Sequence, residues 1–541
     1  MKKFVLALVL PLVFLACNPE NQLPVDNGES GKTPADTVAP KPVLVAPSNL
    51  RVDVQDGIKA VLSWENESTD YDGVEIQKAG TNGKYKIVGN KPAGTLTHTD
   101  EDFTENGQYS YRLCSYKGNT YSDYASVSFT IDGIPDPAPQ VSVTSVETAP
   151  NMIVVRYTIT DDLGGSVKNG VVWTTDGTEP ILDASESYPY WKNLRTDGNG
   201  IGVIMNPEGP VKLRAYAKSI KDGKVGYSAA QAVSPAEEEP AYEVSYTDVT
   251  PSDLPSEIKV YKASTSVTGR PTNIWYAIAD LSTGKVELRV LGSEGSKKKT
   301  SVMAKEQVSV PYVFTNGGYF GGSNSVSYIL DKGKQIAENE SYLSRKKSYY
   351  VSRGVFGVTS TGVASVNWRF GRAIAGGPYF YDTPIPQIDG APEESPSSKY
   401  PSPAINPGYY SALGGGPVLV KDGRTKINFL MLDDVYLSNF ELFPSDIFNK
   451  TTRQPRTAVG RTADGKVVLM VVDGRKSGVS EGVVLTDMAR LMRGVGCVDV
   501  LNLDGGGSSC FLAGQNLNVL NNPSDGTERA VVSVIGFAKA E

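Results

Sequence analysis

The 541-residue sequence contains one histidine, His98, and only four cysteines. With no histidine in the C-terminal half, a Ser-His-Asp or Cys-His centre is excluded there, and so is a zinc or di-iron site built on histidine ligands. Acid–base chemistry is therefore left to carboxylates. The net charge is −7 and no stripe of basic residues stands out, so nucleic acid is not an expected partner.

Long apolar runs are also missing, and the one at the N-terminus is too short to span a bilayer. Lys2 and Lys3 precede apolar residues 4–16, which end at Cys17 in a Phe-Leu-Ala-Cys sequence. Residues 1–17 resemble a bacterial lipoprotein signal peptide with its lipobox. They predict an exported protein, lipid-anchored through Cys17 in the cell envelope, at the outer membrane or cell surface. An ordinary signal peptide with an incidental cysteine is the alternative. The Pro-rich tether over residues 18–43 favours the lipoprotein.

The other cysteines, Cys114, Cys497 and Cys510, cannot all pair, and we expect small buried apolar residues rather than a disulfide scaffold. A bridge between Cys497 and Cys510 is the alternative.

Two β-rich modules follow the tether. Short alternating segments with turn signals predict β-sandwiches over residues 44–133 and 138–234. The first module resembles a fibronectin type III domain, with Trp64 and Tyr111 at core positions, and the second repeats the design less clearly. Neither carries a catalytic constellation, so we interpret both as spacers, with sugar binding as the alternative.

The C-terminal region, residues 241–541, contains two apolar segments that each end in an acid. Residues 467–472 stop at Asp473-Gly474-Arg475, and residues 498–503 stop at Asp504, three glycines, Ser508 and Ser509. Between them, apolar residues at helical spacing over 484–492 predict a helix. Strand, helix and strand predict parallel strands in an α/β domain, a mixed sheet with crossover helices.

Parallel strands place their C-terminal ends at one sheet edge, where open α/β sheets bind ligands. We therefore expect Asp473, Arg475, Asp504 and Ser508 to line one crevice. Asp-Gly is also a common turn pair, so the alternative for each acid alone is a turn cap.

Seven short segments of this region, in family order, carry a resemblance to the phosphodiester glycosidases. They are Asn316-Gly317-Gly318-Tyr319-Phe320, Gly414-Gly415-Gly416-Pro417, Arg456-Thr457-Ala458-Val459-Gly460, Asp473-Gly474-Arg475, Ser480-Glu481-Gly482, the segment from Asn502 to Ser509, and Ser524-Asp525-Gly526 with Glu528-Arg529. The resemblance covers only the C-terminal half. It implies hydrolysis of a glycosyl-1-phosphodiester, of the N-acetylglucosamine-1-phosphodiester kind, with release of sugar and a phosphomonoester.

Carboxylates are the expected catalytic groups, as in most glycosidases. The candidates are Asp473, Asp504, Glu481 and Asp487, although the family usually has glutamate at the last position. The expected substrate-binding residues are Asn316, Gly317, Arg456, Arg475, Gly505, Gly506, Ser508, Ser509, Asp525 and Arg529. Arginine suits a phosphate because its planar fork makes two parallel hydrogen bonds. For Asn316 the alternative is a turn residue, and for Arg529 it is a structural pair with Glu528.

We expect no required cofactor. The alternative is a calcium or magnesium ion held by oxygens of Asp473, Asp504, Asp525 and Asn316, although the spacing matches no calcium loop. The expected partners are a glycan or glycosyl-phosphodiester substrate and the membrane, with the chain a monomer. Two other functions stay open: an inactive surface protein that binds glycans, and a metal-assisted phosphodiesterase that cleaves the P–O bond.

Overall fold

The structure is a computed structural model, and it describes residues 44–541 except 135–137, 163–166, 183–189, 195–198, 294, 345–347, 373–375, 387–394, 428–430, 433–434, 437–439, 444–447 and 449–450. The signal peptide, Cys17 and the tether therefore lie outside the described residues. Contacts divide the chain into two units, Met1–Asp136 and Pro137–Glu541. Within the described residues no helix is long and apolar enough to cross a membrane.

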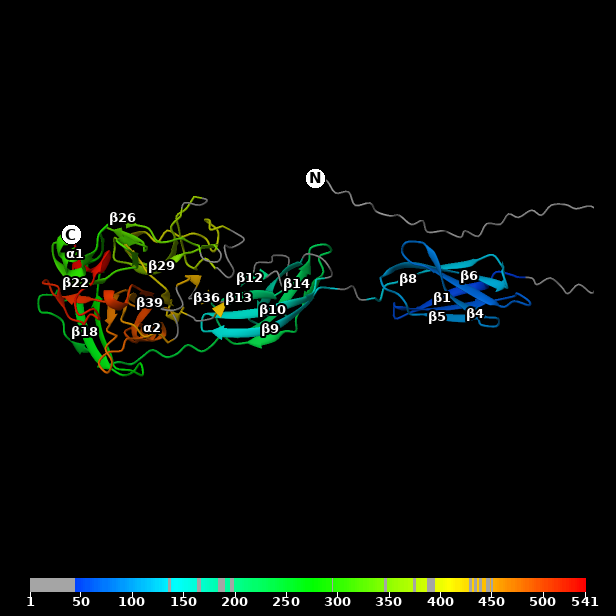
Figure 1. The fold of residues 1–541 in the computed structure, drawn as a ribbon, viewed down its shortest axis with the longest axis horizontal. Coiled ribbons are helices and arrows are strands. Elements are labelled where there is room, and N and C mark those ends of the chain that lie inside the picture. The colour runs from blue at the N-terminus through cyan, green and yellow to red at the C-terminus, as the bar shows by residue number, and fades with distance from the viewer. Residues whose placement is uncertain are drawn as a thin grey trace, which may run out of the picture. The chain divides into compact units, whose positions relative to one another are not determined.

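The first unit is a β-sandwich (Figure 1). One sheet has the order β1-β2-β5, and the other has β4-β3-β6-β7 with β8 paired to β6. The strands are β1 Ser48–Gln55, β2 Lys59–Glu65, β3 Gly73–Ala79, β4 Tyr85–Pro92, β5 Thr97–Asp100, β6 Gly107–Lys117, β7 Thr120–Tyr121 and β8 Ala125–Ile131. Trp64 and Tyr111 lie in the core between the sheets, as predicted.

The second unit begins with another pair of sheets, ordered β12-β13-β10-β9 and β11-β14-β15, with β16 paired to β14. Its strands are β9 Gln140–Ala149, β10 Met152–Asp161, β11 Val167–Thr174, β12 Tyr190–Leu194, β13 Asn199–Met205, β14 Val211–Ser219, β15 Val225–Tyr227 and β16 Gln231–Val233. We call residues 138–234 the second sandwich. Its main core lies between the two sheets and includes Tyr157 and Leu213.

The rest of the second unit is built on three larger sheets. Their orders are β17-β18-β19-β38-β37-β39-β33-β34, β20-β43-β22-β40-β41 and β26-β25-β32-β29-β30-β31. The eight-stranded sheet contains β17 Thr247–Asp248, β18 Ile258–Thr265, β19 Thr272–Ala279, β33 Val418–Lys421, β34 Arg424–Thr425, β37 Arg456–Thr462, β38 Val467–Val472 and β39 Cys497–Asn502. The five-stranded sheet contains β20 Val286–Gly292, β22 Pro311–Asn316, β40 Phe511–Ala513, β41 Asn518–Val519 and β43 Ser533–Lys539. The six-stranded sheet contains β25 Ile329–Asp331, β26 Lys334–Ala337, β29 Arg353–Thr359, β30 Ala364–Phe370, β31 Tyr379–Tyr381 and β32 Tyr409–Gly414.

Smaller elements complete this part of the chain. They are the two-stranded pairs β21 Lys298–Lys299 with β42 Ala530–Val531, β23 Phe320–Gly321 with β24 Asn324–Ser325, β27 Tyr342–Ser344 with β28 Ser348–Tyr350 and β35 Met431–Leu432 with β36 Val435–Tyr436, the helices α1 Thr300–Gln307 and α2 Leu485–Gly494, and a 3-10 turn, η2 Gly506–Ser508.

Strand β38 is apolar throughout because both of its faces are covered. Val467, Leu469 and Val471 belong to the core that the three sheets share. The alternate residues Val468, Met470 and Val472 pack under α2, whose buried side includes Leu485, Met488 and Leu491. The predicted helix is therefore present, and it covers the outer face of the eight-stranded sheet (Figure 1).

The structure does not show the predicted α/β class, a mixed sheet with crossover helices. The described part of the chain is mostly β-sheet, and every pair of hydrogen-bonded neighbours in its large sheets is antiparallel. The physical reason is β37, which lies between β38 and β39 and pairs with both in the antiparallel sense. A strand buried on both faces is typical of parallel sheets, but here a single helix and a packed sheet produce the same sequence pattern.

Strands β38 and β39 nevertheless point the same way, because each is antiparallel to β37. The register aligns Arg456 with Val472 and Ala458 with Asn502. The C-terminal ends of β38 and β39 and the start of β37 thus meet at one sheet edge. Gly415 and Gly416 reach the same edge just before β33, since Gly416 N–H donates to the Asn502 carbonyl at 2.7 Å.

Candidate active site

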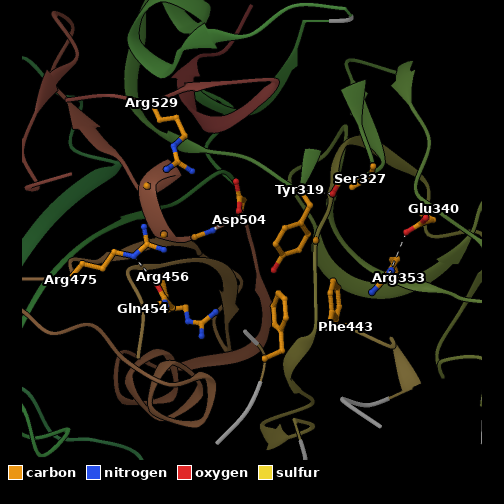
Figure 2. Close-up of a pocket in the computed structure, with 16 residues that line it drawn as sticks. Tyr319, Ser327, Glu340, Arg353, Phe443, Gln454, Arg456, Arg475, Asp504 and Arg529 are labelled. Atoms are coloured by element: carbon orange, nitrogen blue, oxygen red, sulfur yellow. Dashed lines mark hydrogen bonds and ion pairs between the residues drawn. The ribbon is translucent and has the colours of Figure 1, made fainter. Parts of the chain in front are cut away.

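A pocket of about 450 Å³ opens at this sheet edge. Its lining residues are Tyr319, Val326, Ser327, Glu340, Arg353, Gly415, Phe443, Phe448, Gln454, Arg456, Arg475, Asp504, Gly505, Gly506, Gly507 and Arg529. Figure 2 shows three arginines gathered near Asp504 and, across the pocket beyond Tyr319, the pair of Arg353 and Glu340. Six of the predicted site residues are thus brought together: Arg456, Arg475, Asp504, Gly505, Gly506 and Arg529.

Asp504 is held in place through its backbone as well as its carboxylate. Its N–H donates to the Gly317 carbonyl at 3.1 Å, and its carbonyl accepts from Asn316 Nδ2 at 2.7 Å. Asp504 Oδ1 accepts the Gly505 N–H at 2.8 Å. Burial raises the pKa of Asp504, and the Ser508 hydroxyl, the Gly505 N–H and Arg529 oppose that rise. A carboxyl with a raised pKa can hold a proton nearer neutral pH, as a general acid must.

Asn316 supports the site from below and does not line the pocket. Its side chain is fully buried. Asn316 Oδ1 accepts from Thr457 Oγ1 at 2.8 Å and from the Cys510 N–H at 3.3 Å. One amide therefore ties β22 and β37 to the loop that carries Asp504.

The glycines after Asp504 let the arginine side chains approach the backbone. A Cβ on Gly506, which has φ of 61°, would lie 2.9 Å from Arg475 Nη2. A Cβ on Gly507 would lie 1.9 Å from Arg529 Nη2. Any larger residue at these two positions would displace a guanidinium, which explains the glycines at positions 506 and 507.

Each of the three arginines is fixed differently. Arg456 is buried, and it donates from Nη2 to the Thr452 carbonyl at 3.2 Å. Burial lowers the pKa of Arg456 to about 10, and the neighbouring Arg475 acts in the same direction. Arg475 donates from Nε to Gln454 Oε1 at 2.8 Å. Arg529 pairs with Asp525 at 2.7 Å, and not with Glu528, whose carboxylate accepts from Ser301 instead.

Arg475 also carries backbone strain. Its φ is 63°, in the left-handed region. For a residue with a Cβ, this backbone conformation is about 1–2 kcal/mol less stable than the ordinary helical conformation. Strain of this kind is concentrated at functional sites, because the surrounding structure must hold the residue in place.

The other predicted catalytic acids do not line the pocket. The buried carboxylate of Asp473 accepts from Asn521 Nδ2 at 2.9 Å and from the Asn522 N–H at 3.0 Å, so it holds the loop after β41. Burial raises the pKa of Asp473 to about 6, against the effect of these donors. These contacts give the Asp473 carboxylate a structural role in binding a loop distant in sequence, and Asp473 is not among the lining residues.

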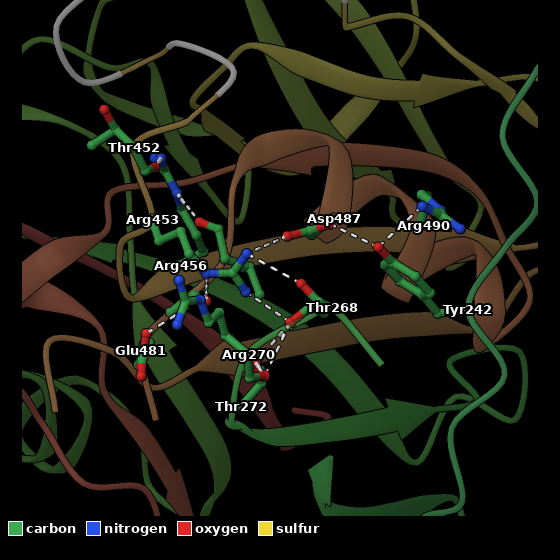
Figure 3. A network of polar contacts seen from close by, with 12 residues as sticks. Tyr242, Thr268, Arg270, Thr272, Thr452, Arg453, Arg456, Glu481, Asp487 and Arg490 are labelled. Atoms are coloured by element: carbon green, nitrogen blue, oxygen red, sulfur yellow. Dashed lines mark hydrogen bonds and ion pairs between the residues drawn. The ribbon is translucent and has the colours of Figure 1, made fainter. Parts of the chain in front are cut away.

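Glu481 and Asp487 belong to a polar network on the α2 side of the sheet (Figure 3). Asp487 accepts from the Tyr242 hydroxyl at 2.8 Å and from Arg453 Nη1 at 3.2 Å. Glu481 lies 3.8 Å from Arg270 Nε. The network fixes the start of α2 to the segments around Tyr242 and Arg453.

The remaining predicted residues, which include Ser508, Ser509 and Gly317, do not line the pocket. Ser508 and Ser509 are buried, and Ser509 Oγ lies 3.3 Å from Thr457 Oγ1, which donates to Asn316 Oδ1. Gly317 N–H donates to the Ser533 carbonyl at 2.8 Å. In the described residues there is no group of three or more His, Cys, Asp or Glu side chains placed to hold a metal. Cys114, Cys497 and Cys510 are buried and free, as predicted.

The sequence did not point to several lining residues. Glu340 is the second carboxylate among the described lining residues, and its side chain is 45% exposed. No motif surrounds Glu340, and the sequence alone does not distinguish it from Glu338. In the structure Glu338 pairs with Arg369 at 2.6 Å. Tyr319 lies in a matched segment, where its hydroxyl donates to the Gly416 carbonyl at 2.7 Å. Arg353 packs over the Phe443 ring at 4.0 Å.

A buried acid, Glu441, lies behind the pocket wall. Glu441 Oε1 accepts the Trp368 indole N–H at 2.5 Å and the Val418 N–H at 3.2 Å. No donor among the described residues reaches Oε2. Burial raises the pKa of Glu441 to about 8.

This raised pKa predicts how stability depends on pH. Between about pH 4.3 and the folded pKa, the unfolded chain releases a proton that the folded protein keeps. The free energy of unfolding should therefore fall as pH rises through this interval. Glu441→Gln should reduce that slope, measured by chemical denaturation at pH 5 and pH 8. Parallel pH dependences of the variant and the parent protein would contradict the prediction.

Comparison with known proteins identifies the domain that carries the pocket. The family model described as phosphodiester glycosidase matches residues 311–538, so the chain contains a phosphodiester glycosidase domain. The mouse (Mus musculus) N-acetylglucosamine-1-phosphodiester alpha-N-acetylglucosaminidase is 31% identical over 123 residues, which is 22% of this chain and 22% of the mouse protein. The SPbeta prophage-derived uncharacterized protein YomE of Bacillus subtilis (strain 168) is 44% identical over 84 residues, 15% of this chain and 12% of that protein.

Each of these matches thus spans less than a quarter of the relative's length. Among solved structures, the catalytic domain of the zebrafish N-acetylglucosamine-1-phosphodiester alpha-N-acetylglucosaminidase is similar, with 18% sequence identity and a TM-score of 0.36. That comparison covers 56% of this chain and 89% of the zebrafish chain.

Proposed function

We propose that the protein hydrolyses a glycosyl-1-phosphodiester of the N-acetylglucosamine-1-phosphodiester kind, releasing the sugar and a phosphomonoester. The observation that carries this proposal is the convergence of Arg456, Arg475 and Arg529 beside Asp504 in one pocket of a phosphodiester glycosidase domain. The arginines supply positive charge for a phosphate, and Asp504 supplies an acid whose pKa burial raises.

The chemistry divides between the two ends of the pocket. The bond between the anomeric carbon and the bridging oxygen breaks, and the oxygen leaves with the phosphate. A phosphomonoester is already a good leaving group. Guanidinium groups that stabilise the negative charge developing on it lower the barrier further. A water oxygen adds to the anomeric carbon, and its proton passes to a carboxylate.

Two carboxylates among the described lining residues are available for these proton transfers. Asp504 lies among the arginines, where it serves the departing phosphate or the anomeric carbon. Glu340 lies across the pocket, 3.9 Å from Arg353 Nη2. Glycosidases typically use two such acids on opposite sides of the scissile bond. The aromatic rings of Tyr319, Phe443 and Phe448 lie between the two ends and offer apolar surface to a sugar ring.

The direct test of this function is a synthetic N-acetylglucosamine-1-phosphodiester incubated with the full chain. The proposal predicts equal amounts of free N-acetylglucosamine and phosphomonoester. Binding without turnover would favour a glycan-binding protein instead. Turnover that stops with a chelator and resumes with calcium or magnesium would favour the metal-assisted alternative.

We also propose that Cys17 carries the lipid that anchors the protein in the bacterial envelope, since the lipobox-like sequence and the tether support an exported lipoprotein. Cys17→Ser should then move the protein from the membrane fraction to the soluble fraction, measured by fractionation and by metabolic labelling with a fatty acid. A variant that stays with the membrane and keeps the label would place the anchor elsewhere.

A further inference from the structure

Four consecutive residues, 440–443, connect the second sandwich to the pocket. The Phe440 ring is fully buried among residues of β9, β10 and β13, including Met152 and Val203. The next side chain, Glu441, points the other way, to Trp368 of β30 and the N–H of Val418. We call residues 440–443 the wall segment.

The end of the wall segment forms part of the pocket itself. Phe443 lines the pocket, and its ring centroid lies 5.5 Å from that of Tyr319 and 4.7 Å from that of Phe448 (Figure 2). Arg353 lies over the same ring and also donates from Nη1 to the Glu441 carbonyl. Phe443, which lines the pocket at the proposed sugar position, is thus only three residues along the chain from Phe440, which is buried in the second sandwich.

The backbone of the wall segment is strained. Phe440 has φ of 64° and Leu442 has φ of 53°, both in the left-handed region. For bulky residues each such conformation is costly and persists only when the surrounding structure fixes it. Here Phe440 is fixed by the second sandwich, and Leu442 is fixed by Tyr349 and Val351.

One buried and three part-buried hydrogen bonds hold the second sandwich next to the eight-stranded sheet. Asn151, at the β9–β10 turn, donates from Nδ2 to the Lys426 carbonyl at 2.8 Å, and Lys426 Nζ donates to Asn206 Oδ1 at 2.6 Å. Arg424 of β34 donates from Nη2 to the carbonyls of Pro150 and Pro207 at 3.0 Å and 3.1 Å. These contacts fix the sandwich surface against which Phe440 packs.

We propose that the second sandwich contributes to substrate binding by the hydrolase. Through Phe440 it positions the aromatic wall of the pocket, and it thereby sets the affinity for the sugar half of the substrate. The inference rests on the proposed function and replaces the interpretation of this module as a spacer. Phe440 is a positioning residue, since it lies in the sandwich core and acts on the pocket only through residues 441–443.

The test compares Phe440→Ala with two matched variants of the full chain. Removing the ring should release the strained backbone and raise KM for the synthetic phosphodiester by about tenfold or more, with a smaller effect on kcat, because Asp504, Arg456, Arg475 and Arg529 are held by contacts outside the wall segment. Phe440→Leu should restore most of the affinity. Leu213→Ala, which removes apolar volume from the other core of the same sandwich, should leave KM unchanged.

A second measurement does not depend on activity. In Phe440→Ala, hydrogen exchange should become faster at the backbone N–H of Val418, which donates to the Glu441 carboxylate. In Leu213→Ala, exchange at the same N–H should stay slow. If the parent protein hydrolyses no phosphodiester, the proposed function fails, while the exchange result still decides whether the sandwich holds the wall. If Phe440→Ala does not fold, Arg424→Ala gives the same test with a smaller expected effect. Unchanged KM and unchanged exchange at Val418 would overturn the inference.

Discussion

Asp504→Asn is expected to reduce kcat for a glycosyl-1-phosphodiester by about 10²–10⁴-fold, the range that general acid–base catalysis contributes. The amide can still accept the Gly505 N–H and leaves the backbone contacts with Asn316 and Gly317 intact, so the fold should survive. The substitution removes the carboxyl group of Asp504, which can exchange a proton with the substrate. Initial rates with saturating substrate and a thermal unfolding curve measure the two effects separately.

Asp499→Asn provides a matched control for this experiment. Asp499 lies on β39, on the same strand that leads to Asp504, and at 1% exposure it is more buried than Asp504. Its partners are Arg461 and the Asp422 N–H, away from the pocket. This variant should lose stability but keep kcat. Near-normal turnover in Asp504→Asn would remove Asp504 from the mechanism.

The second large effect is expected for Arg475→Lys. A lysine keeps the positive charge but cannot make two parallel hydrogen bonds to a phosphate, and a hydrogen bond to a charged group contributes about 1.5–3 kcal/mol. The kcat/KM for phosphodiester substrates should therefore fall by about tenfold or more. Aryl glycosides of the same sugar carry no phosphate, and they should lose much less.

Arg461→Lys is the matched control, because Arg461 is held by Asp499 at the opposite end of β37 and β39. Equal losses on both substrate types would contradict the phosphate role of Arg475. Such a result would instead assign it a structural role through Gln454, its hydrogen-bond partner, and leave the phosphate to Arg456 and Arg529.

The sequence predicted much of the site because strand ends are local features. The apolar run of β39 followed by Asp504 and the glycines could be recognised without knowing the sheet order, and so could the position of Arg475 after β38. The common direction of β38 and β39 was also predicted correctly, since α2 connects them. The insertion of antiparallel β37 between them could not be predicted, because its pairing with β39 joins segments that are distant in sequence.

Asp473 and Glu340 show where the sequence was insufficient. Both are acids, but Asp473 turns toward Asn521 and Asn522, whereas Glu340 faces the pocket from a segment without any motif. The direction of a side chain at a loop or strand end depends on tertiary contacts. The same limit applies to Phe440, whose partners lie in a module that the sequence presented as separate.

Cleavage in oxygen-18 water tests the central claim most directly. The full chain would be incubated with a synthetic N-acetylglucosamine-1-phosphodiester, and both products would be analysed by mass spectrometry. Hydrolysis at the anomeric carbon predicts one oxygen-18 atom in the sugar and none in the phosphomonoester. Label in the phosphomonoester would show cleavage of the P–O bond and contradict the account.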